Sequence, residues 1–275
     1  MSSPRIAKVP SRHRRSRGGA HRRLLRRWQR RARWARRKLK AAPSSLRYTV
    51  IATSALVFFL AADLVYQVAR KPSEMLAPVS GGLNKMPAET WRHYGPLFRE
   101  YSTAAITPEL LAALAQVEGA GNPMARTYWR WRLTWNPLAI YQPASSAVGT
   151  YQMTDAAFAD ARRFCIRDHE VVEDCWFNGL YTRIVPSHAV ELTAVFLDRN
   201  VAAILATRPR ATATPQQKQA LATIIHLCGP GPAREFARRG FTLSEGARCG
   251  DHDVATYLAR VNAMKREFLR LAAAG

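Results

Sequence analysis

The sequence predicts a mainly α-helical protein, with a single helical domain after one N-terminal transmembrane helix. Apolar residues recur at 3.6-residue spacing in most segments beyond residue 88, and no stretch of comparable length alternates between apolar and polar residues as a strand does. One unbroken apolar run precedes that region. These features divide the chain into a basic tail, a transmembrane helix, a linker and one helical domain, at residues 1–47, 48–69, 70–87 and 88–275.

Positive charge is concentrated in the tail. Residues 1–47 contain 18 of the 42 Lys and Arg residues and no Asp or Glu, so the rest of the chain keeps only +5 of the formal net charge of +23. The charge therefore does not mark the folded domain as a nucleic-acid binder, and we expect no nucleic acid as a partner. Apolar residues of the tail recur at helical spacing, at Leu24, Trp28, Ala32, Ala35 and Leu39. This pattern fits either a basic amphipathic helix on an anionic leaflet or a disordered arm that only sets orientation.

The apolar run at residues 48–69 reads YTVIATSALVFFLAADLVYQVA and is long enough to cross a bilayer as a helix. Its only charged residue, Asp63, lies near one end, and Tyr48 and Tyr66 can sit at the two interfaces. The alternative is a cleaved signal peptide, but the segment before the run would then be far longer than the usual basic region. We therefore favour an uncleaved anchor. The positive-inside rule places the tail in the cytoplasm and residues 70–275 on the other side.

All four cysteines follow the transmembrane helix. An even number of cysteines in an oxidising compartment predicts two disulfides, for which three connectivities are possible. The pairs Cys165–Cys175 and Cys228–Cys249 close the shortest loops, and we expect those two. No two cysteines have CxxC spacing, so zinc and redox-active dithiol sites are not indicated, and we expect no metal and no cofactor.

The first elements after the anchor are a linker and an aromatic helix. Prolines and glycines in the linker favour a flexible coil. A helix is expected over residues 88–102, and we expect its aromatic face to pack onto the domain rather than to bind sugar. That face consists of Trp91, Tyr94, Phe98 and Tyr101.

Further helices follow towards the C-terminus. Thr154 caps one that carries Phe158, Ala161 and Phe164 on one side. Another is expected at about residues 187–207, with apolar residues facing inward. The next runs from a capping box at Thr214 to Cys228, and the last carries apolar residues from 254 to 271.

The stretch TPELLAALAQVEGAGNP, residues 107–123, combines a well-defined helix with a candidate catalytic acid. Thr107 is a good N-cap, and Gly119 and Gly121 end the helix. Glu118 lies beside the apolar face at the negative end of the helix dipole, so burial and the dipole both favour its protonated form. Such a carboxyl suits a general acid. The stretch alone fits an idle, half-exposed glutamate at least as well.

The segment after Pro123 is rich in aromatic and basic residues. Its rings, at Trp129, Trp131, Trp135 and Tyr141, are dense for a loop. Aromatic rings stack on sugar faces, but they also cover protein cores, and we expect about half of these rings to do the latter.

Three motifs, EGAGNP, AVGTYQM and HLCGPG, follow one another in a fixed order. Together they resemble the SLT domain of soluble-type lytic transglycosylases, in glycoside hydrolase family 23, whose fold is related to goose-type lysozyme. The usual family pattern is a helix ending in Glu-Ser-x-x-x-Pro, then Gly-Leu-Met-Gln, then Ala-Tyr-Asn-Ala-Gly-Pro-Gly. The resemblance covers about residues 105–265 and implies a lysozyme-like helical domain.

The resemblance also implies roles for individual residues. Glu118 matches the catalytic acid and base, and Tyr257, in TYLARV, matches a late tyrosine that usually lines the cleft. The expected substrate-binding residues, from the motifs and the aromatic segment, are Asn122, Trp131, Gly149, Tyr151, Gln152, His226 and Tyr257.

Three positions depart from the family pattern. Gly119 stands where a serine usually follows the catalytic glutamate, so one hydroxyl near the acid is missing. His226 and Leu227 replace the Tyr-Asn pair of the third motif, whose tyrosine usually hydrogen-bonds the catalytic carboxyl. His226 is the candidate to take its place.

The chemistry implied by the family needs only one carboxyl group. Protonated Glu118 would donate to the glycosidic oxygen between N-acetylmuramic acid and N-acetylglucosamine. The carboxylate would then accept the proton of the muramic acid's own 6-hydroxyl as that oxygen closes onto C1. Two acids follow the second motif, and we interpret Asp155 as a first-turn helix residue and Asp160 as a surface residue.

The function implied is a lytic transglycosylase of the periplasm, anchored in the bacterial inner membrane and acting on peptidoglycan strands. Two alternatives stay open. A non-catalytic module would bind peptidoglycan and tether a cell-envelope protein complex, which the altered third motif favours. A lysozyme-like hydrolase would release products with reducing ends.

Overall fold

The structure is a computed structural model that describes residues 29–30, 33–34, 37, 41–71, 81–173, 175–207 and 213–274. The five apolar positions of the tail and residues 72–80 of the linker lie outside this part of the chain, so the predictions made for them stay predictions. The chain separates into two compact units, residues 1–62 and 63–275.

Among the described residues, one helix is long and apolar enough to cross a membrane. It is α2 (Ser44–Arg70), with 27 residues and a mean hydropathy of 1.9 in its most apolar window. It extends past both predicted ends, because the Arg47 amide bonds to the Pro43 carbonyl and the Lys71 amide bonds to the Gln67 carbonyl. The coarse prediction of one candidate membrane helix is confirmed.

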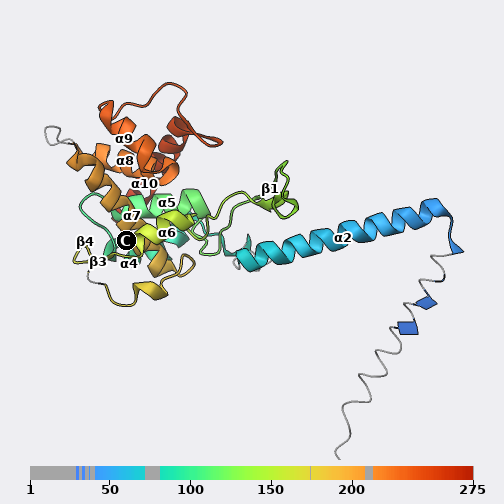
Figure 1. The fold of residues 1–275 in the computed structure, drawn as a ribbon. Helices are drawn as coiled ribbons and strands as arrows, with labels where there is room; N and C mark the ends of the chain where they lie inside the picture. The colour runs from blue at the N-terminus through green and yellow to red at the C-terminus, as the bar shows by residue number, and fades with distance from the viewer. Residues whose placement is uncertain are drawn as a thin grey trace, which may run out of the picture. The chain divides into compact units, whose positions relative to one another are not determined.

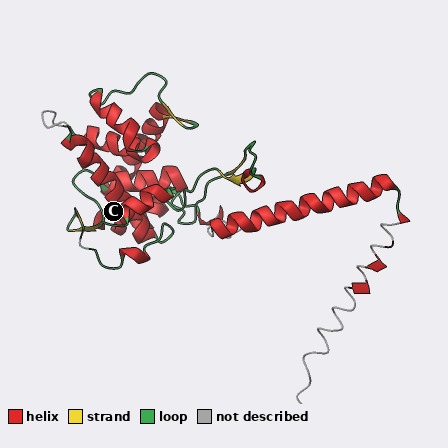
Figure 2. Cartoon of the chain, viewed as in Figure 1, coloured by secondary structure: helices red, strands yellow, loops and turns green. Residues whose placement is uncertain are grey.

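The second unit is mainly helical, as predicted (Figures 1 and 2). After α2 its helices are α4 (Pro87–Glu100), α5 (Pro108–Gly119), α6 (Asp155–Ala161), α7 (Pro186–Ala206), α8 (Pro215–Cys228), α9 (Pro230–Arg238) and α10 (Val254–Ala273). The sequence predicts all of them except α9. The helix predicted to carry Phe164 stops at Ala161, because the Phe164 amide bonds to the Ala161 carbonyl in a turn.

The core of this unit is built around α5. Leu110, Leu111 and Leu114 are fully buried, and α4 and α10 pack against their helix. α7 packs against α6 and α8, which closes the helical body seen in Figure 1. The aromatic face of α4 packs inward as predicted, with Phe98 buried and the Trp91 ring 5.7 Å from that of Phe268.

The described residues also contain three short antiparallel hairpins. They are β1 (Trp129–Trp131) with β2 (Tyr141–Pro143), β3 (Cys165–Arg167) with β4 (Glu170–Val172), and β5 (Arg248–Cys249) with β6 (His252–Asp253). Three 3-10 turns accompany them, at η2 (Gly81–Leu83), η3 (Pro137–Ala139) and η4 (Asn178–Leu180). Strands of two or three residues are too short to show alternation, so sequence reasoning does not predict them.

Both predicted disulfides are present. Cys165–Cys175 joins the start of β3 to the loop after β4, with 5.9 Å between the two Cα atoms. Cys228–Cys249 joins the last residue of α8 to β5, with 5.4 Å between the Cα atoms. Because β5 and β6 lead directly into α10, the second bridge ties the end of α8 to the start of α10.

The domain begins before the predicted boundary at residue 88. The Lys85 amide donates to the Ala120 carbonyl (2.8 Å), and the Lys85 ammonium donates to the Gly121 carbonyl (3.2 Å). The Gln116 amide nitrogen donates back to the Lys85 carbonyl (2.9 Å). Residues 81–87, assigned to the linker from their glycines, therefore pack against the end of α5.

Candidate active site

The carboxyl group of Glu118 lies in the last turn of α5. Thr107 caps the other end of this helix, where its hydroxyl accepts from the Leu110 amide. The helix ends after Glu118 because Ala120 takes the left-handed conformation (φ 49°) and Gly121 follows at φ 63°. The Glu118 side chain is 19% exposed and lines a hollow of about 480 Å³.

Two side chains from other helices meet the same oxygen of Glu118. The hydroxyl of Tyr257, on α10, donates to Glu118 Oε1 in a short hydrogen bond. Nε2 of His226, on α8, lies 3.7 Å from that oxygen, and the His226 side chain is 10% exposed. The sequence predicts both as site residues, and the structure brings them together although they are distant along the chain. Both contacts use Oε1, so Oε2 is the oxygen that can face a ligand.

Burial dominates the electrostatics of these two partners. It lowers the pKa of His226 from the usual 6.5, and the nearby Glu118 charge and a hydrogen bond with the Tyr151 backbone oppose that shift without reversing it. Burial, and then the Glu118 charge, raise the pKa of Tyr257 well above its ordinary value. At neutral pH, Tyr257 is therefore a hydroxyl donor and His226 is mainly a neutral imidazole.

The lowered pKa of His226 predicts a loss of stability in mild acid. The unfolded chain binds this proton more readily than the folded chain, so the contribution is fully present above about pH 6.5 and is lost as the pH falls through the lower folded pKa. We expect the melting temperature to fall between about pH 7 and pH 5, and His226→Gln to flatten that fall. His93→Gln, at an exposed position of α4, is the control. Identical profiles for wild type and His226→Gln would contradict this assignment.

The second motif forms a tight loop beside the site. Gly149 has φ 83°, and a Cβ there would lie 2.1 Å from the Arg183 carbonyl oxygen, so only glycine fits. The Gln152 side chain donates to the Gly149 carbonyl (3.0 Å). Gln152 and His226 both line a second hollow, of about 280 Å³. Glu118 lines the first hollow and His226, 3.7 Å from it, lines the second, so this pair of side chains stands between the two.

Three of the predicted substrate-binding residues do other work. Tyr151 is 1% exposed and lines neither hollow, so its ring belongs to the core. Asn122 is 2% exposed, and its side chain bonds to Asn84 (2.9 Å) and to the Met124 amide (2.8 Å). Asn122 thus holds the turn after α5, although it still borders the hollow beside Glu118.

Trp131 is the third of these residues. It lies on the β1–β2 hairpin, its side chain is 67% exposed, and its ring stacks on Tyr141 with 4.5 Å between centroids. It lines neither of the two hollows that adjoin Glu118. The position of Trp131 on the hairpin therefore does not place it beside Glu118, and its role in substrate binding stays a prediction.

Close packing explains why a glycine, Gly119, follows Glu118. A Cβ on Gly119 would lie 2.6 Å from the backbone oxygen of Thr150, in the loop of the second motif. The end of α5 and that loop approach each other more closely than a side chain permits. The serine expected from the family pattern does not fit here.

Gly119→Ala should therefore destabilise the domain by about 1–3 kcal/mol, because backbone must move to admit the methyl group. Gly95→Ala is the matched control, since Gly95 is also helical and a Cβ there meets its neighbours at ordinary contact distances of 3.6 Å. Urea unfolding of both variants checks the difference. Equal free energies of unfolding for the two variants would contradict this prediction, because they would show that the loop containing Thr150 moves without cost.

Several residues that line the hollow beside Glu118 were not predicted from the sequence. Arg126 and Tyr128 border the hollow beside Glu118, as do Gly81 and Asn84 from before α4. Tyr128 belongs to the aromatic segment, but Trp131 is the residue of that segment that was predicted from the sequence to bind substrate. The residues before α4 carried no signal of their own, since glycine and asparagine are typical of loops.

The two other acids near the second motif are already paired. Asp155, in the first turn of α6, lies 2.6 Å from an Arg183 nitrogen, and Asp160 contacts Arg163 and Arg199. Neither lines a hollow beside Glu118. Among the described residues, no three His, Cys, Asp or Glu side chains gather as metal ligands would.

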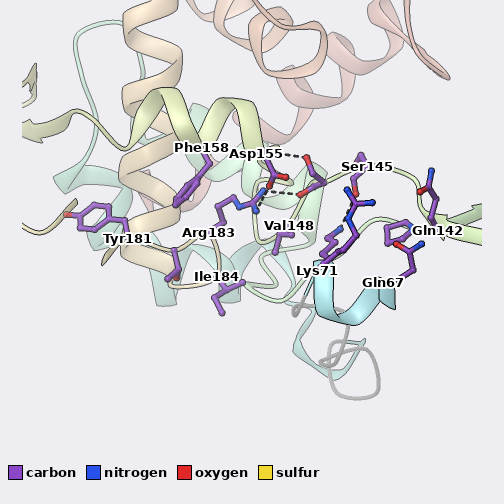
Figure 3. Close-up of a pocket in the computed structure, with 14 residues that line it drawn as sticks. Gln67, Lys71, Gln142, Ser145, Val148, Asp155, Phe158, Tyr181, Arg183 and Ile184 are labelled. Atoms are coloured by element: carbon purple, nitrogen blue, oxygen red, sulfur yellow. Dashed lines mark hydrogen bonds and ion pairs between the residues drawn. The ribbon is translucent and has the colours of Figure 1, made fainter. Parts of the chain in front are cut away.

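A larger hollow, of about 580 Å³, lies away from this site (Figure 3). Arg183 and Asp155 line it together with Gln67 and Lys71 from the end of α2, and none of Glu118, His226 or Tyr257 does. Arg183 also donates to the Ser146 and Met153 carbonyls (2.9 and 2.8 Å). Its contacts thereby hold the loop that carries Gln152.

The comparisons with known proteins identify no family. No model of a known protein family matches the chain, and a search of curated proteins finds no match either. The carboxyl of Glu118, the hydroxyl of Tyr257 and the imidazole of His226 are therefore interpreted from their geometry. A carboxyl held by a hydroxyl donor, half-buried and between two hollows, can give a proton to a bound ligand and take one back.

Proposed function

We propose that this chain is a membrane-anchored lytic transglycosylase that cleaves the β-1,4 bond between N-acetylmuramic acid and N-acetylglucosamine in peptidoglycan. One observation supports the proposal. The three motifs that resemble the SLT domain gather around Glu118. Glu118 begins the first motif, His226 of the third lies 3.7 Å from its carboxyl group, and Gln152 of the second lines the same hollow as His226. Convergence of the motifs on one acid is what the proposed chemistry needs.

In the proposed reaction, Glu118 Oε2 carries the proton and donates it to the glycosidic oxygen as the bond from that oxygen to C1 breaks. Positive charge develops at C1, and the muramic acid's 6-hydroxyl oxygen forms a new bond to C1. Its proton passes to the Glu118 carboxylate, which restores the acid. No water is consumed and no second carboxylate is needed, because the nucleophile belongs to the substrate.

The neighbours of Glu118 have separate roles in this scheme. The Tyr257 hydroxyl donates to Oε1 and so fixes the carboxyl rotamer with Oε2 towards the sugar. Neutral His226 stands where the family has a tyrosine, and its ring lies close enough to respond to the charge that Glu118 gains and loses. Gln152 borders the second hollow, where a sugar next to the cleaved bond would lie.

The anchor completes the proposal. α2 holds the domain at the bilayer, and the basic tail directs it to the side opposite the cytoplasm, the periplasm of a bacterial inner membrane. The two disulfides agree with an oxidising compartment.

A second function is favoured by the 3.7 Å separation of His226 and Glu118, which is longer than a good hydrogen bond. A chain whose acid is poorly held on that side would bind glycan without cutting it. The full-length chain in detergent, incubated with purified sacculi, separates the possibilities. Soluble muropeptides with anhydro ends support the proposal. Reducing ends indicate a hydrolase, and sedimentation with the sacculi without any release indicates a binding module.

A further inference from the structure

The β1–β2 hairpin, residues 129–143, exposes a cluster of large apolar side chains at its tip. We name it the aromatic hairpin. Trp131 is 67% exposed, Leu133 109% and Trp135 103%, and Arg130 and Arg132 are exposed among them. An exposed apolar cluster of this kind marks a surface that interacts with a partner.

The hairpin's own contacts hold its backbone and the Trp131 ring in place. Tyr141 on β2 stacks on Trp131, and the Arg132 amide donates to the Ile140 carbonyl (2.7 Å). The Asn136 side chain accepts from the Leu138 amide (3.1 Å) and closes the turn at η3. Since the backbone of the tip is preformed, less conformational entropy is lost when a partner covers it than for a flexible loop.

The hairpin and the loop after it are bonded to the end of α2. The side-chain nitrogen of Gln67, 4% exposed, donates to the Leu138 carbonyl at the tip (2.6 Å). The Lys71 ammonium donates to the Ser145 and Ala147 carbonyls (3.2 and 2.9 Å). Figure 3 shows Gln67 and Lys71 beside Ser145, all within the second unit.

These bonds fix the depth of the hairpin relative to a bilayer. A helix of 27 residues is about 40 Å long, roughly 10 Å more than the hydrocarbon core of a membrane. If the apolar run spans that core, Gln67, two residues before the end of the run, lies where the hydrocarbon core meets the headgroups. The hairpin tip, bonded to Gln67, lies at the same level.

We propose that the tip of the aromatic hairpin inserts into the headgroup region of the membrane that anchors the chain, with phospholipid as its partner. Tryptophan side chains favour this region, and the arginines beside them are suited to lipid phosphate. In this proposal, the fully exposed side chains of Leu133 and Trp135 are the ones that enter the lipid. This proposal rests on the anchor part of the proposed function and is independent of the chemistry at Glu118.

Glycan is the alternative partner, because rings also stack on sugars. Two observations favour lipid. Trp131 already uses one ring face to stack on Tyr141, and neither Trp131 nor Trp135 lines a hollow beside Glu118. The tip is also hydrogen-bonded to the anchor helix itself. A surface that binds glycan strands does not require such a contact. Insertion would give the domain a second attachment and hold it close to the membrane surface.

Quenching of tryptophan emission by brominated phospholipids tests the proposal. The full chain is reconstituted in phosphatidylcholine–phosphatidylglycerol vesicles, with Trp28→Phe and Trp34→Phe removing the tail tryptophans. We expect brominated lipid to quench part of the remaining emission, and Trp131→Ala with Trp135→Ala to remove most of the quenched part. Trp135→Ala alone, at a fully exposed position, should remove a smaller share without loss of folding. The control is Trp176→Ala, because Trp176 is 74% exposed outside the hairpin.

The outcomes are distinct. Loss of quenching in the hairpin variants, with quenching kept in Trp176→Ala, supports insertion. Equal quenching in all variants, or none in any, overturns it. If brominated lipid does not quench the tryptophan emission, but soluble glycan fragments shift its wavelength, the insertion proposal is overturned in favour of a sugar-binding hairpin. The measurement works equally on a Glu118→Gln background, so loss of the proposed activity does not affect it.

Discussion

Glu118→Gln should reduce the release of soluble muropeptides from sacculi by at least about a hundredfold, because a general acid commonly contributes that much or more. The amide has nearly the shape of the carboxyl group, and its oxygen can still accept the hydrogen bond from Tyr257. It cannot donate an acidic proton to the glycosidic oxygen, and it cannot then collect the proton of the sugar hydroxyl. Release by the full-length chain in detergent, quantified by chromatography and mass, measures the effect.

Glu109→Gln is the matched control for this prediction. Glu109 lies in the first turn of the same helix, is also partly exposed, and lines neither hollow beside Glu118. The same chemical change there should leave release within about twofold of wild type, as expected of a residue outside the site. Melting temperatures of both variants show whether the fold is intact. A Glu118→Gln chain as active as the Glu109→Gln chain would remove Glu118 from the mechanism.

Removal of the Cys228–Cys249 bridge should have the second large effect. The bridge spans 21 residues, for which the loss of loop constraint amounts to about 3 kcal/mol. For a domain of this size that corresponds to roughly 10 °C in melting temperature. The bridge also joins the end of α8, two residues after His226, to the strand pair that leads into α10 and Tyr257. Serine at both positions should therefore lower activity as well as stability.

The other disulfide separates these two effects. Cys165–Cys175 spans 10 residues and joins β3 to the loop after β4, which does not line the hollows beside Glu118. Serine at both of its positions should lower the melting temperature by a similar amount and leave the activity of the folded fraction near wild type. Activity measured well below both melting temperatures makes the comparison. If removing either disulfide lowered activity by the same factor, the claim that the α8–α10 connection positions the site would be contradicted.

The helical part of the fold could be predicted from the sequence because its signals are local. Thr107, Thr154 and Thr214 cap their helices as expected, and the apolar spacing defines the buried faces. The two disulfides followed from loop length alone. The proximity of Glu118, His226 and Tyr257 was also expected from the resemblance that the three motifs carry, and α5, α8 and α10 bring these residues together.

The rest depended on contacts between distant segments. The position of Trp131 is set by a hairpin whose strands are too short to leave a pattern in the sequence. Tyr151 occupies the core because the loop around Gly149 packs against the Arg183 backbone, a contact that no local rule gives. Residues 81–87 have the composition of a linker, yet Lys85 bonds to the end of α5.

The oxygen source of the product tests the central claim most directly. Sacculi are digested by the wild-type chain in water enriched in heavy oxygen, and the masses of the released muropeptides are measured. If Glu118 activates the substrate's own hydroxyl, the products carry anhydro ends without any solvent oxygen. Products with reducing ends that carry heavy oxygen would contradict the account, because water rather than the sugar hydroxyl would then have attacked C1.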